Sequence, residues 1–228
     1  MGENDLPEIP AARADDLHHL TDAQDADLTL FMAGNQFMAM EELLAAFRQR
    51  YPAVKKIFYE TLPPGLELKQ IHARGARFAG EILSVQPDVY TSVRRQAMET
   101  LVQGRLLAPD GYRPYLRNRL TLMIPSGNPA GISTVSDLGK PAVRISQPDP
   151  ENEDIARHIV RMYEDAGGAE LVKRIMEEKR AEGTTVMTLV HHRETPLRIG
   201  LRTVDVGPVW ATEAVYARQS GLDFDTIE

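Results

Sequence analysis

Several features that would direct an interpretation are missing from this chain of 228 residues. It contains no cysteine, which excludes disulfide bridges, thiolate metal sites and cysteine nucleophiles. No run approaches the ~18 apolar residues that a membrane-spanning helix needs. The first segment also lacks the apolar stretch of roughly 7–15 residues that is typical of a secretory signal peptide. We therefore expect neither a membrane span nor an export signal in the chain as given, and the lack of cysteine suits an oxidising compartment as well as the cytosol.

An excess of positive charge is missing as well. The formal net charge is −7, but residues 1–28 hold eight acids and one base, so the rest of the chain is formally neutral with 25 of each. A neutral body offers no broad basic surface to nucleic-acid phosphates, so we expect no nucleic-acid binding. Residues 1–27 are polar and bury little, and we interpret them as a flexible acidic tail.

What the chain does contain, from Leu28 onward, is an alternation of two patterns. Short β-type apolar runs are followed by turn formers and then by apolar residues at helical spacing, which predicts an α/β fold with mostly parallel sheets. A strand at 28–32, a turn at Gly34-Asn35 and a helix at 37–47 form the first unit. Further strands are expected at 54–60, 87–91, 119–124, 141–146, 184–190 and 204–210, and further helices at 66–83, 92–103, 152–166, 169–181 and 193–201.

The turn formers of residues 125–131 (PSGNPAG) divide this alternation into two halves. We interpret the segment as a connection between two Rossmann-like lobes, lobe 1 at 28–124 and lobe 2 from 125 to 216. Signatures of common enzymes are absent from both, including the phosphate loop, the dinucleotide fingerprint, the nucleophile elbow and the HExxH zinc motif.

Small polar residues follow several of the predicted strands. Asn35, Thr61, Ser92 with its neighbour Thr91, and Ser146 stand at predicted carboxyl ends. In open α/β sheets ligands bind beyond those ends, where helix N-termini present backbone N–H groups. Such a set can hold a small anion without a catalytic group. The same residue types are ordinary helix N-caps worth about 1 kcal/mol, which is the competing interpretation.

Three further residues are candidates for the second half. His192 and Arg193 stand at the start of a predicted helix, where they can meet an anion or simply form a solvated loop with a satisfied histidine. The adjacent His191 points to the opposite side of an extended chain, so the two histidines do not readily chelate one metal. Trp210, the single tryptophan, ends an apolar strand as core or cleft wall, and its N–H needs a partner.

Four carboxylates gather at residues 149–154, at the start of a predicted helix. They favour the helix dipole but would repel an anion bound close by. A hard-cation site is one interpretation of this segment, and a solvated helix start is the more ordinary one.

Taken together, these segments resemble the extracellular solute-binding proteins of ABC transporters, specifically the molybdate/tungstate-type group. The resemblance covers about residues 28–225. It rests on LFMAGNQFMAMEELLAAF (30–47), PDVYTSV (87–93), VRISQPDPENEDIARHI (143–159), VDVGPVWATEA (204–214) and, most specifically, RNRLTLMIPSGNPAGI (117–132). It implies the type II periplasmic binding protein fold with a ligand cleft between two lobes. Residues 217–228 would then begin a return crossover to lobe 1, and the C-terminal remainder of that return would be missing.

The function implied by the resemblance is capture of a small oxyanion, such as molybdate or tungstate, for an ABC transporter permease. It implies no catalysis, no cofactor and no bound metal, a monomer, and a periplasmic or extracellular location. The ligand set would comprise Asn35, Thr61, Ser92, Ser146, His192, Arg193 and Trp210. Within it Asn35 and Ser92 take the places of anion-contacting serines, Trp210 that of a ligand-facing tyrosine, and His192 that of a backbone N–H donor.

Three alternatives stay open at this point. The lack of an export signal and the acidic first segment favour a cytoplasmic ligand-sensing or partner-binding module on the same fold. A metal or metal chelate can replace the oxyanion as ligand. An enzyme using His192 and Glu194 as an acid–base pair is the third alternative.

Overall fold

The computed structural model describes residues 6–151 and 153–228, and the chain divides into two compact units, Met1–Leu116 and Arg117–Glu228. The predicted α/β class and the division into two units are confirmed. The boundary expected after residue 124 is wrong, because β7 (Leu120–Pro125) belongs to the second unit. Both of its hydrogen-bonded neighbours, β10 (Gly207–Trp210) and β11 (Phe224–Ile227), come from the end of the chain.

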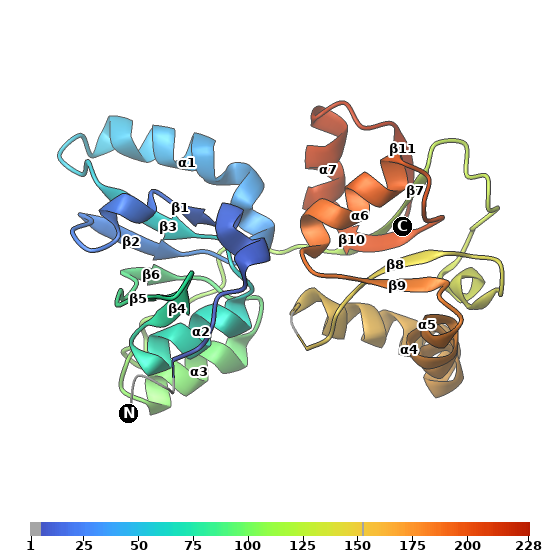
Figure 1. Ribbon diagram of the computed structural model, residues 1–228, viewed down its shortest axis with the longest axis horizontal. Coiled ribbons are helices and arrows are strands. Elements are labelled where there is room, and N and C mark those ends of the chain that lie inside the picture. The colour runs from blue at the N-terminus through green and yellow to red at the C-terminus, as the bar shows by residue number, and fades with distance from the viewer. Residues whose placement is uncertain (1–5, 152) are drawn as a thin grey trace. The chain divides into compact units, whose positions relative to one another are not determined.

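The first unit is built on a four-stranded sheet of order β1-β3-β2-β6. Its strands β2 (Leu28–Phe31), β3 (Ile57–Glu60) and β6 (Val89–Tyr90) are parallel, as predicted, and β1 (Leu17–His18) is antiparallel to β3. Figure 1 shows α1 (Phe37–Arg50) on one face of this sheet and α2 (Pro64–Ala73) with α3 (Arg95–Gln103) on the other.

The core of the first unit follows from the two-residue period of its strands. Ile57 and Tyr59 pack with Met40 and Leu44 of α1, whereas Phe58, between them in the sequence, packs in a separate cluster with Ile71 of α2 and other buried residues. Successive side chains of a strand point to opposite faces, so one short apolar run supplies both layers.

The N-terminal segment is folded rather than flexible within its described part, residues 6–27. Leu17 pairs with Glu60 in the sheet, and Ile9, only 1% exposed, packs in the same cluster as Phe58. The expectation of a flexible tail is therefore wrong for these residues, and residues 1–5 lie outside the described part. A few well-placed apolar side chains and an open strand edge were enough to fold a segment that is acidic on average.

A second correction concerns the helix expected over 66–83. It ends at Ala73, and the chain continues through β4 (Ala76–Phe78) and β5 (Glu81–Leu83), an antiparallel hairpin. At Gly75 the backbone has φ +157°, and a Cβ there would lie 2.9 Å from the Leu83 carbonyl oxygen. The close approach of the hairpin to this glycine is a tertiary feature that helical spacing does not predict.

The second unit combines antiparallel and parallel pairing. The strands β10, β7 and β11 form an antiparallel sheet, while β8 (Ile145–Pro148) and β9 (Thr185–Thr188) are parallel. A parallel bridge between Ile145 and Val206 ties β8 to the segment that leads into β10. In Figure 1, α4 (Ile155–Lys173) and α5 (Lys179–Ala181) lie on one side of these strands, and α6 (His191–Gly200) and α7 (Ala211–Gln219) on the other. The remaining helical turns are η2 (Ala11–Asp16), η3 (Leu20–Asp22), η4 (Gly34–Gln36), η5 (Val135–Gly139) and the π-turn η6 (Arg174–Glu178).

The end of the chain differs from the expected return crossover at 217–228. These residues complete α7 and form β11, which pairs with β7 inside the second unit. The buried ring of Phe224 packs with Met123, Ile199 and Val209, so this segment belongs to the core of the second unit. The helices expected at 152–166 and 169–181 are joined in α4 across a kink at Gly167 and Gly168, and Asn152 lies outside the described residues.

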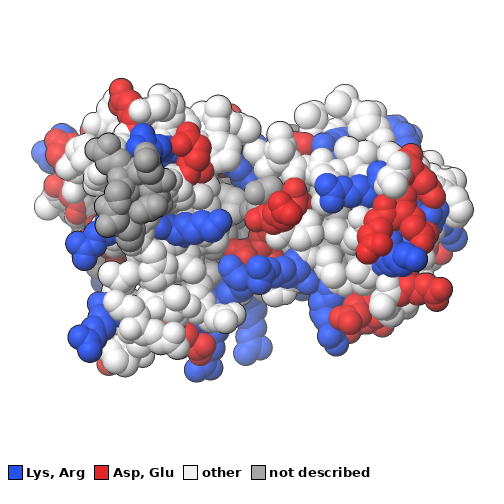
Figure 2. All heavy atoms as spheres, turned by 60° about the horizontal axis from the view of Figure 1, so that its bottom comes forward, with Lys and Arg blue, Asp and Glu red and all other residues white. Residues whose placement is uncertain are grey.

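Charge is mixed on the face of the molecule that Figure 2 shows. In Figure 2 acidic and basic side chains occur beside one another on both units, in line with the neutral formal charge after residue 28. Among the described residues, no helix is long and apolar enough to span a membrane.

Candidate functional site

The parallel strands of the first unit end at a common edge of the sheet. Phe31 lies beside both Glu60 and Tyr90 in the strand register, so the residues that follow these three positions are brought together. Thr91 ties two of the ends, because its Oγ1 accepts a hydrogen bond from the Ala33 N–H at 2.7 Å. The structure thus places Asn35, Thr61 and Ser92 at one edge of the sheet, although they are far apart in the sequence. We call this set the first-unit polar edge.

The three residues of the first-unit polar edge differ in access. Asn35 lies in η4 and is partly exposed, and its Oδ1 has no hydrogen-bond partner among the described residues. Ser92 is also partly exposed, and its Oγ accepts the Arg94 N–H at 3.2 Å just before α3. Thr61 is fully buried, and its N–H donates to the Asp16 carbonyl at 2.9 Å. Asn35 and Ser92 are therefore open to a solute, and Thr61 is closed.

A buried carboxyl group that the sequence interpretation missed stands beside this edge. Burial raises the pKa of Glu60 to about 8, and the nearby Asp16 carboxylate acts in the same direction, while the Gln70 Nε2 donates to Glu60 Oε1 at 2.8 Å. At neutral pH Glu60 is therefore mostly protonated and adds little negative charge to the edge. Its place at the end of the apolar run IFYE was the signal available in the sequence.

In the second unit, Ser146 is an internal residue. It is fully buried in β8, and its N–H donates to the Val206 carbonyl at 2.9 Å. Its hydroxyl lies 2.8 Å from the Thr195 hydroxyl and accepts from Arg198 at 3.3 Å. These bonds tie β8 to α6 and engage both the backbone and the side chain of the predicted ligand residue.

The two histidines at the start of α6 are both buried. His191 Nε2 lies 2.8 Å from the Pro208 carbonyl oxygen, and its Nδ1 lies 3.2 Å from Thr188 Oγ1 and 3.1 Å from Thr195 Oγ1. His191 is thus a satisfied core histidine. His192 is buried at the same helix start, and Arg193 is partly exposed.

Glu194 is committed to the structure of this helix start. Its Oε1 accepts the N–H groups of Leu189 and Val190, both at 2.6 Å, and its Oε2 pairs with Arg198 at 2.6 Å. A carboxylate held by two backbone donors and a guanidinium is a helix cap rather than a proton acceptor for His192. This geometry argues against the acid–base alternative.

Two more carboxyl groups are buried near the starts of α4 and α7. Glu153 Oε1 accepts the His191 N–H at 3.2 Å. Glu213, which is 4% exposed, accepts the backbone N–H of Trp210, and burial together with the charge of Glu153 raises its pKa to about 8. Within the described residues no group of three or more histidines or carboxylates is arranged to hold a metal ion. The acidic segment therefore contributes to the packing of helix starts.

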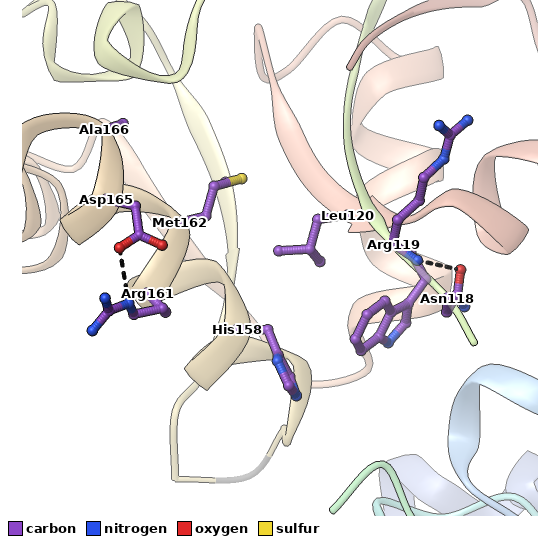
Figure 3. Close-up of a pocket in the computed structure, with 9 residues that line it drawn as sticks. Asn118, Arg119, Leu120, His158, Arg161, Met162, Asp165 and Ala166 are labelled. Atoms are coloured by element: carbon purple, nitrogen blue, oxygen red, sulfur yellow. Dashed lines mark hydrogen bonds and ion pairs between the residues drawn. The ribbon is translucent and has the colours of Figure 1, made fainter. Parts of the chain in front are cut away.

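A pocket of about 540 Å³ lies beside these helix starts, wholly within the second unit. Trp210 lines it and meets His158 with ring centroids 5.4 Å apart, inclined by 58°. Figure 3 shows Met162 of α4 and Leu120 of β7 reaching toward the same space from opposite sides. The residues that line the pocket are Asn118, Arg119, Leu120, His158, Arg161, Met162, Asp165, Ala166 and Trp210. Trp210 is thus the predicted site residue that lines a pocket, and His158 is the neighbour that the sequence interpretation missed.

Two α/β units with polar strand ends and a pocket are the architecture of a solute-binding protein. The chain matches the family model of the bacterial extracellular solute-binding proteins over residues 28–227, and it belongs to that family. A search of the curated proteins found no match.

Solved structures of solute-binding proteins share the fold. The sulfate-binding protein SubI from Mycobacterium tuberculosis H37Rv aligns with a TM-score of 0.64 at 17% identity, covering 88% of this chain and 70% of that one. The periplasmic molybdate-binding protein of Azotobacter vinelandii aligns with a TM-score of 0.62 at 15% identity, covering 81% and 71%. Iron-bound HitA from Pseudomonas aeruginosa aligns with a TM-score of 0.62 at 15% identity, covering 88% and 68%. The expected resemblance to periplasmic binding proteins of type II is confirmed.

Proposed function

We propose that this chain is the solute-binding component of an ABC importer and that it captures a small oxyanion of the molybdate or tungstate kind without catalysis. The observation that supports the proposal is the first-unit polar edge, where Asn35, Thr61 and Ser92 follow the ends of three neighbouring parallel strands. Ligands of open α/β sheets bind at such an edge.

The chemistry of the first-unit polar edge suits an anion held by neutral donors. The side-chain amide of Asn35 and the hydroxyl of Ser92 can each donate one hydrogen bond, and α1 and α3 begin next to them. Helix N-termini carry partial positive charge, which favours an anion without a neutralising cation. Protonation of Glu60 removes one negative charge beside the edge. Thr61, whose N–H donates to the Asp16 carbonyl, would join the site only after the segment at Asp16 moves.

Two of the structural neighbours are named as molybdate- and sulfate-binding proteins, which supports an oxyanion, and the iron-bound neighbour keeps a metal chelate as the competing ligand. The proposal includes a periplasmic or extracellular location, delivery to a transporter permease, and a monomeric state. The cytoplasmic sensor on the same fold would bind its ligand in the same place but deliver it to no permease.

A thermal-shift series with the full chain tests the proposal. Molybdate, tungstate, sulfate, phosphate and ferric citrate are each added in excess, because a ligand at 100 times its Kd stabilises the folded state by about 2.7 kcal/mol. We expect molybdate and tungstate to raise the melting temperature of the wild type. The shift should be lost in a variant carrying both Asn35→Ala and Ser92→Ala.

The matched control is Ser133→Ala, an exposed serine of the second unit. If only ferric citrate raises the melting temperature, the ligand is a metal chelate and not an oxyanion. The absence of any shift, or an undiminished molybdate shift in the double variant, would contradict the proposal.

A further inference from the structure

We propose that Tyr115 is a further ligand-binding residue of the first-unit polar edge and that its hydroxyl group donates a hydrogen bond to the bound oxyanion. The inference rests on the proposed function, because it adds one donor to the same anion site. Tyr115 belongs to the first unit and lies in the segment 104–116, which follows α3. No residue of this segment was expected in the ligand set from the sequence.

Two hydrogen bonds place the Tyr115 hydroxyl at the first-unit polar edge. Gln36 Nε2 donates to Tyr115 Oη, and the Thr91 side chain is hydrogen-bonded to the same oxygen. Gln36 directly follows Asn35 in the chain, and Thr91 directly precedes Ser92. The phenol oxygen is therefore tied to the neighbours of the two ligand residues that are open to a solute.

The directions of these bonds leave the proton of the Tyr115 hydroxyl for a ligand. A hydroxyl oxygen can accept two hydrogen bonds and donate one. The amide nitrogen of Gln36 can only donate, so it fills one acceptor position. Thr91 Oγ1 already accepts the Ala33 N–H at 2.7 Å, which leaves its own proton for the second acceptor position of Tyr115. Toward an anion, Tyr115 then acts only as a donor.

These groups form a chain of donors that points in one direction. The Ala33 N–H donates to Thr91, Thr91 donates to Tyr115, and Tyr115 donates to the anion. Successive hydrogen bonds of this kind polarise and strengthen one another. Burial raises the pKa of the Tyr115 phenol, while the bonds from Gln36 and Thr91 act in the opposite direction, as donors to a phenol oxygen do. The phenol is thus protonated at neutral pH and able to donate.

Oxygens without partners at the same edge provide an independent indication of a ligand. Thr61 is fully buried, and its Oγ1 has no hydrogen-bond partner among the described residues. The enclosed Oδ1 of Asn35 has none within the same part of the chain. Buried polar groups without partners are rare in folded proteins, and they mark places where a ligand, an ion or water completes the structure. Tyr115 thus reaches an edge whose polar groups are not satisfied by the chain itself.

Isothermal titration calorimetry of the full chain with molybdate tests the inference. Tyr115→Phe keeps the ring and removes the hydroxyl, and because Tyr115 is exposed the change removes no core packing. We expect at least about tenfold weaker molybdate binding, the loss of one hydrogen bond to a charged group. Tyr112→Phe is the matched control, since it removes a hydroxyl of the same segment that is hydrogen-bonded to Arg95. This variant should bind molybdate as the wild type does.

A second measurement separates contact with the anion from mere support of Gln36 and Thr91. A phenol that donates to the anion loses this bond when it ionises. Molybdate should therefore raise the pKa of Tyr115 by about 1 pH unit, the reciprocal of a tenfold loss of affinity. Nuclear magnetic resonance of isotope-labelled tyrosine gives this pKa, with the Tyr115 signal identified as the one missing from Tyr115→Phe.

The possible results distinguish the inference from the proposed function. Molybdate binding that is lost in the Asn35→Ala, Ser92→Ala double variant but unchanged in Tyr115→Phe would overturn the inference and leave the proposed function intact. A Tyr115 pKa that is the same with and without molybdate, or equal losses of affinity in Tyr115→Phe and Tyr112→Phe, would also overturn it. If the wild type does not bind molybdate, the proposed function and the inference both fail.

Discussion

The buried carboxyl of Glu213 makes the stability of the second unit depend on pH in an unusual direction. Its pKa is about 8 in the folded chain, against an ordinary value of 4.5. The folded state therefore binds this proton more tightly than the unfolded state does. The stabilisation is fully present below about pH 4.5 and is lost as the pH rises through about 8.

The size of the effect follows from the linkage relation. Between the two pKa values one carboxyl changes the free energy of unfolding by about 1.4 kcal/mol per pH unit, and over the whole window by roughly 5 kcal/mol. Glu213→Gln keeps the shape of the protonated group and removes its titration. We expect the wild type to lose several kcal/mol more than Glu213→Gln between pH 5 and pH 8.

The chain carries its own reporter for this measurement. Trp210 is the only tryptophan, and its backbone N–H donates to the Glu213 carboxyl group in the second unit. Urea unfolding followed by its fluorescence at a series of pH values gives the free energy for the unit that contains Glu213. Glu170→Gln, at an exposed glutamate of α4, is the matched control and should follow the wild type. If the free energy of unfolding changes with pH by the same amount in the wild type and in Glu213→Gln, the reasoning is refuted.

Three further predictions concern stability. Burial raises the pKa of Glu60 to about 8 as well, so the wild type should lose stability in the first unit between about pH 4.5 and 8, and Glu60→Gln should lose less. Melting temperatures from far-UV circular dichroism at a series of pH values would show this difference, and an equal pH dependence in both proteins would contradict it. Lys179→Ala should cost about 3 kcal/mol in urea unfolding, because Lys179 Nζ donates to the carbonyls of Lys140 and Val143 at 2.7 Å and the variant loses both hydrogen bonds. The exposed Lys173→Ala should cost less than about 1 kcal/mol, and equal costs would refute the role of the buried ammonium. Ile9→Ala should cost about 2–4 kcal/mol and raise the protease sensitivity of residues 6–27, an outcome that a flexible tail would not produce.

Much of the architecture could be predicted from the sequence, because it depends on local periodicity. The runs at Leu28–Phe31 and Ile57–Glu60 are short, apolar and bounded by turn formers, and both form parallel strands as expected. Family membership was predictable for the same reason, because the order of the predicted strands and helices can be derived from the sequence. The place of Asn35, Thr61 and Ser92 at one sheet edge follows directly from parallel strands.

Other features depend on contacts between distant residues and were not predictable. Leu17 folds onto the edge of β3, so the acidic composition of the first segment did not decide its structure. β7 joins the second unit because its partners β10 and β11 come about 80–100 residues later, a pairing that no local pattern reveals. Strand partners are chosen by the whole fold, and periodicity describes one element at a time.

The absences in the sequence excluded thiol chemistry and a broad basic surface, and its periodicity determined the α/β class and the division into two units. Only the tertiary structure decided which polar residues are exposed and which serve the interior. It left Asn35 and Ser92 partly exposed, enclosed Thr61 and Ser146, and placed Trp210 in a pocket with His158. The physical reason is that burial sets both the access and the pKa of a group, and burial arises from packing between segments that are far apart along the chain.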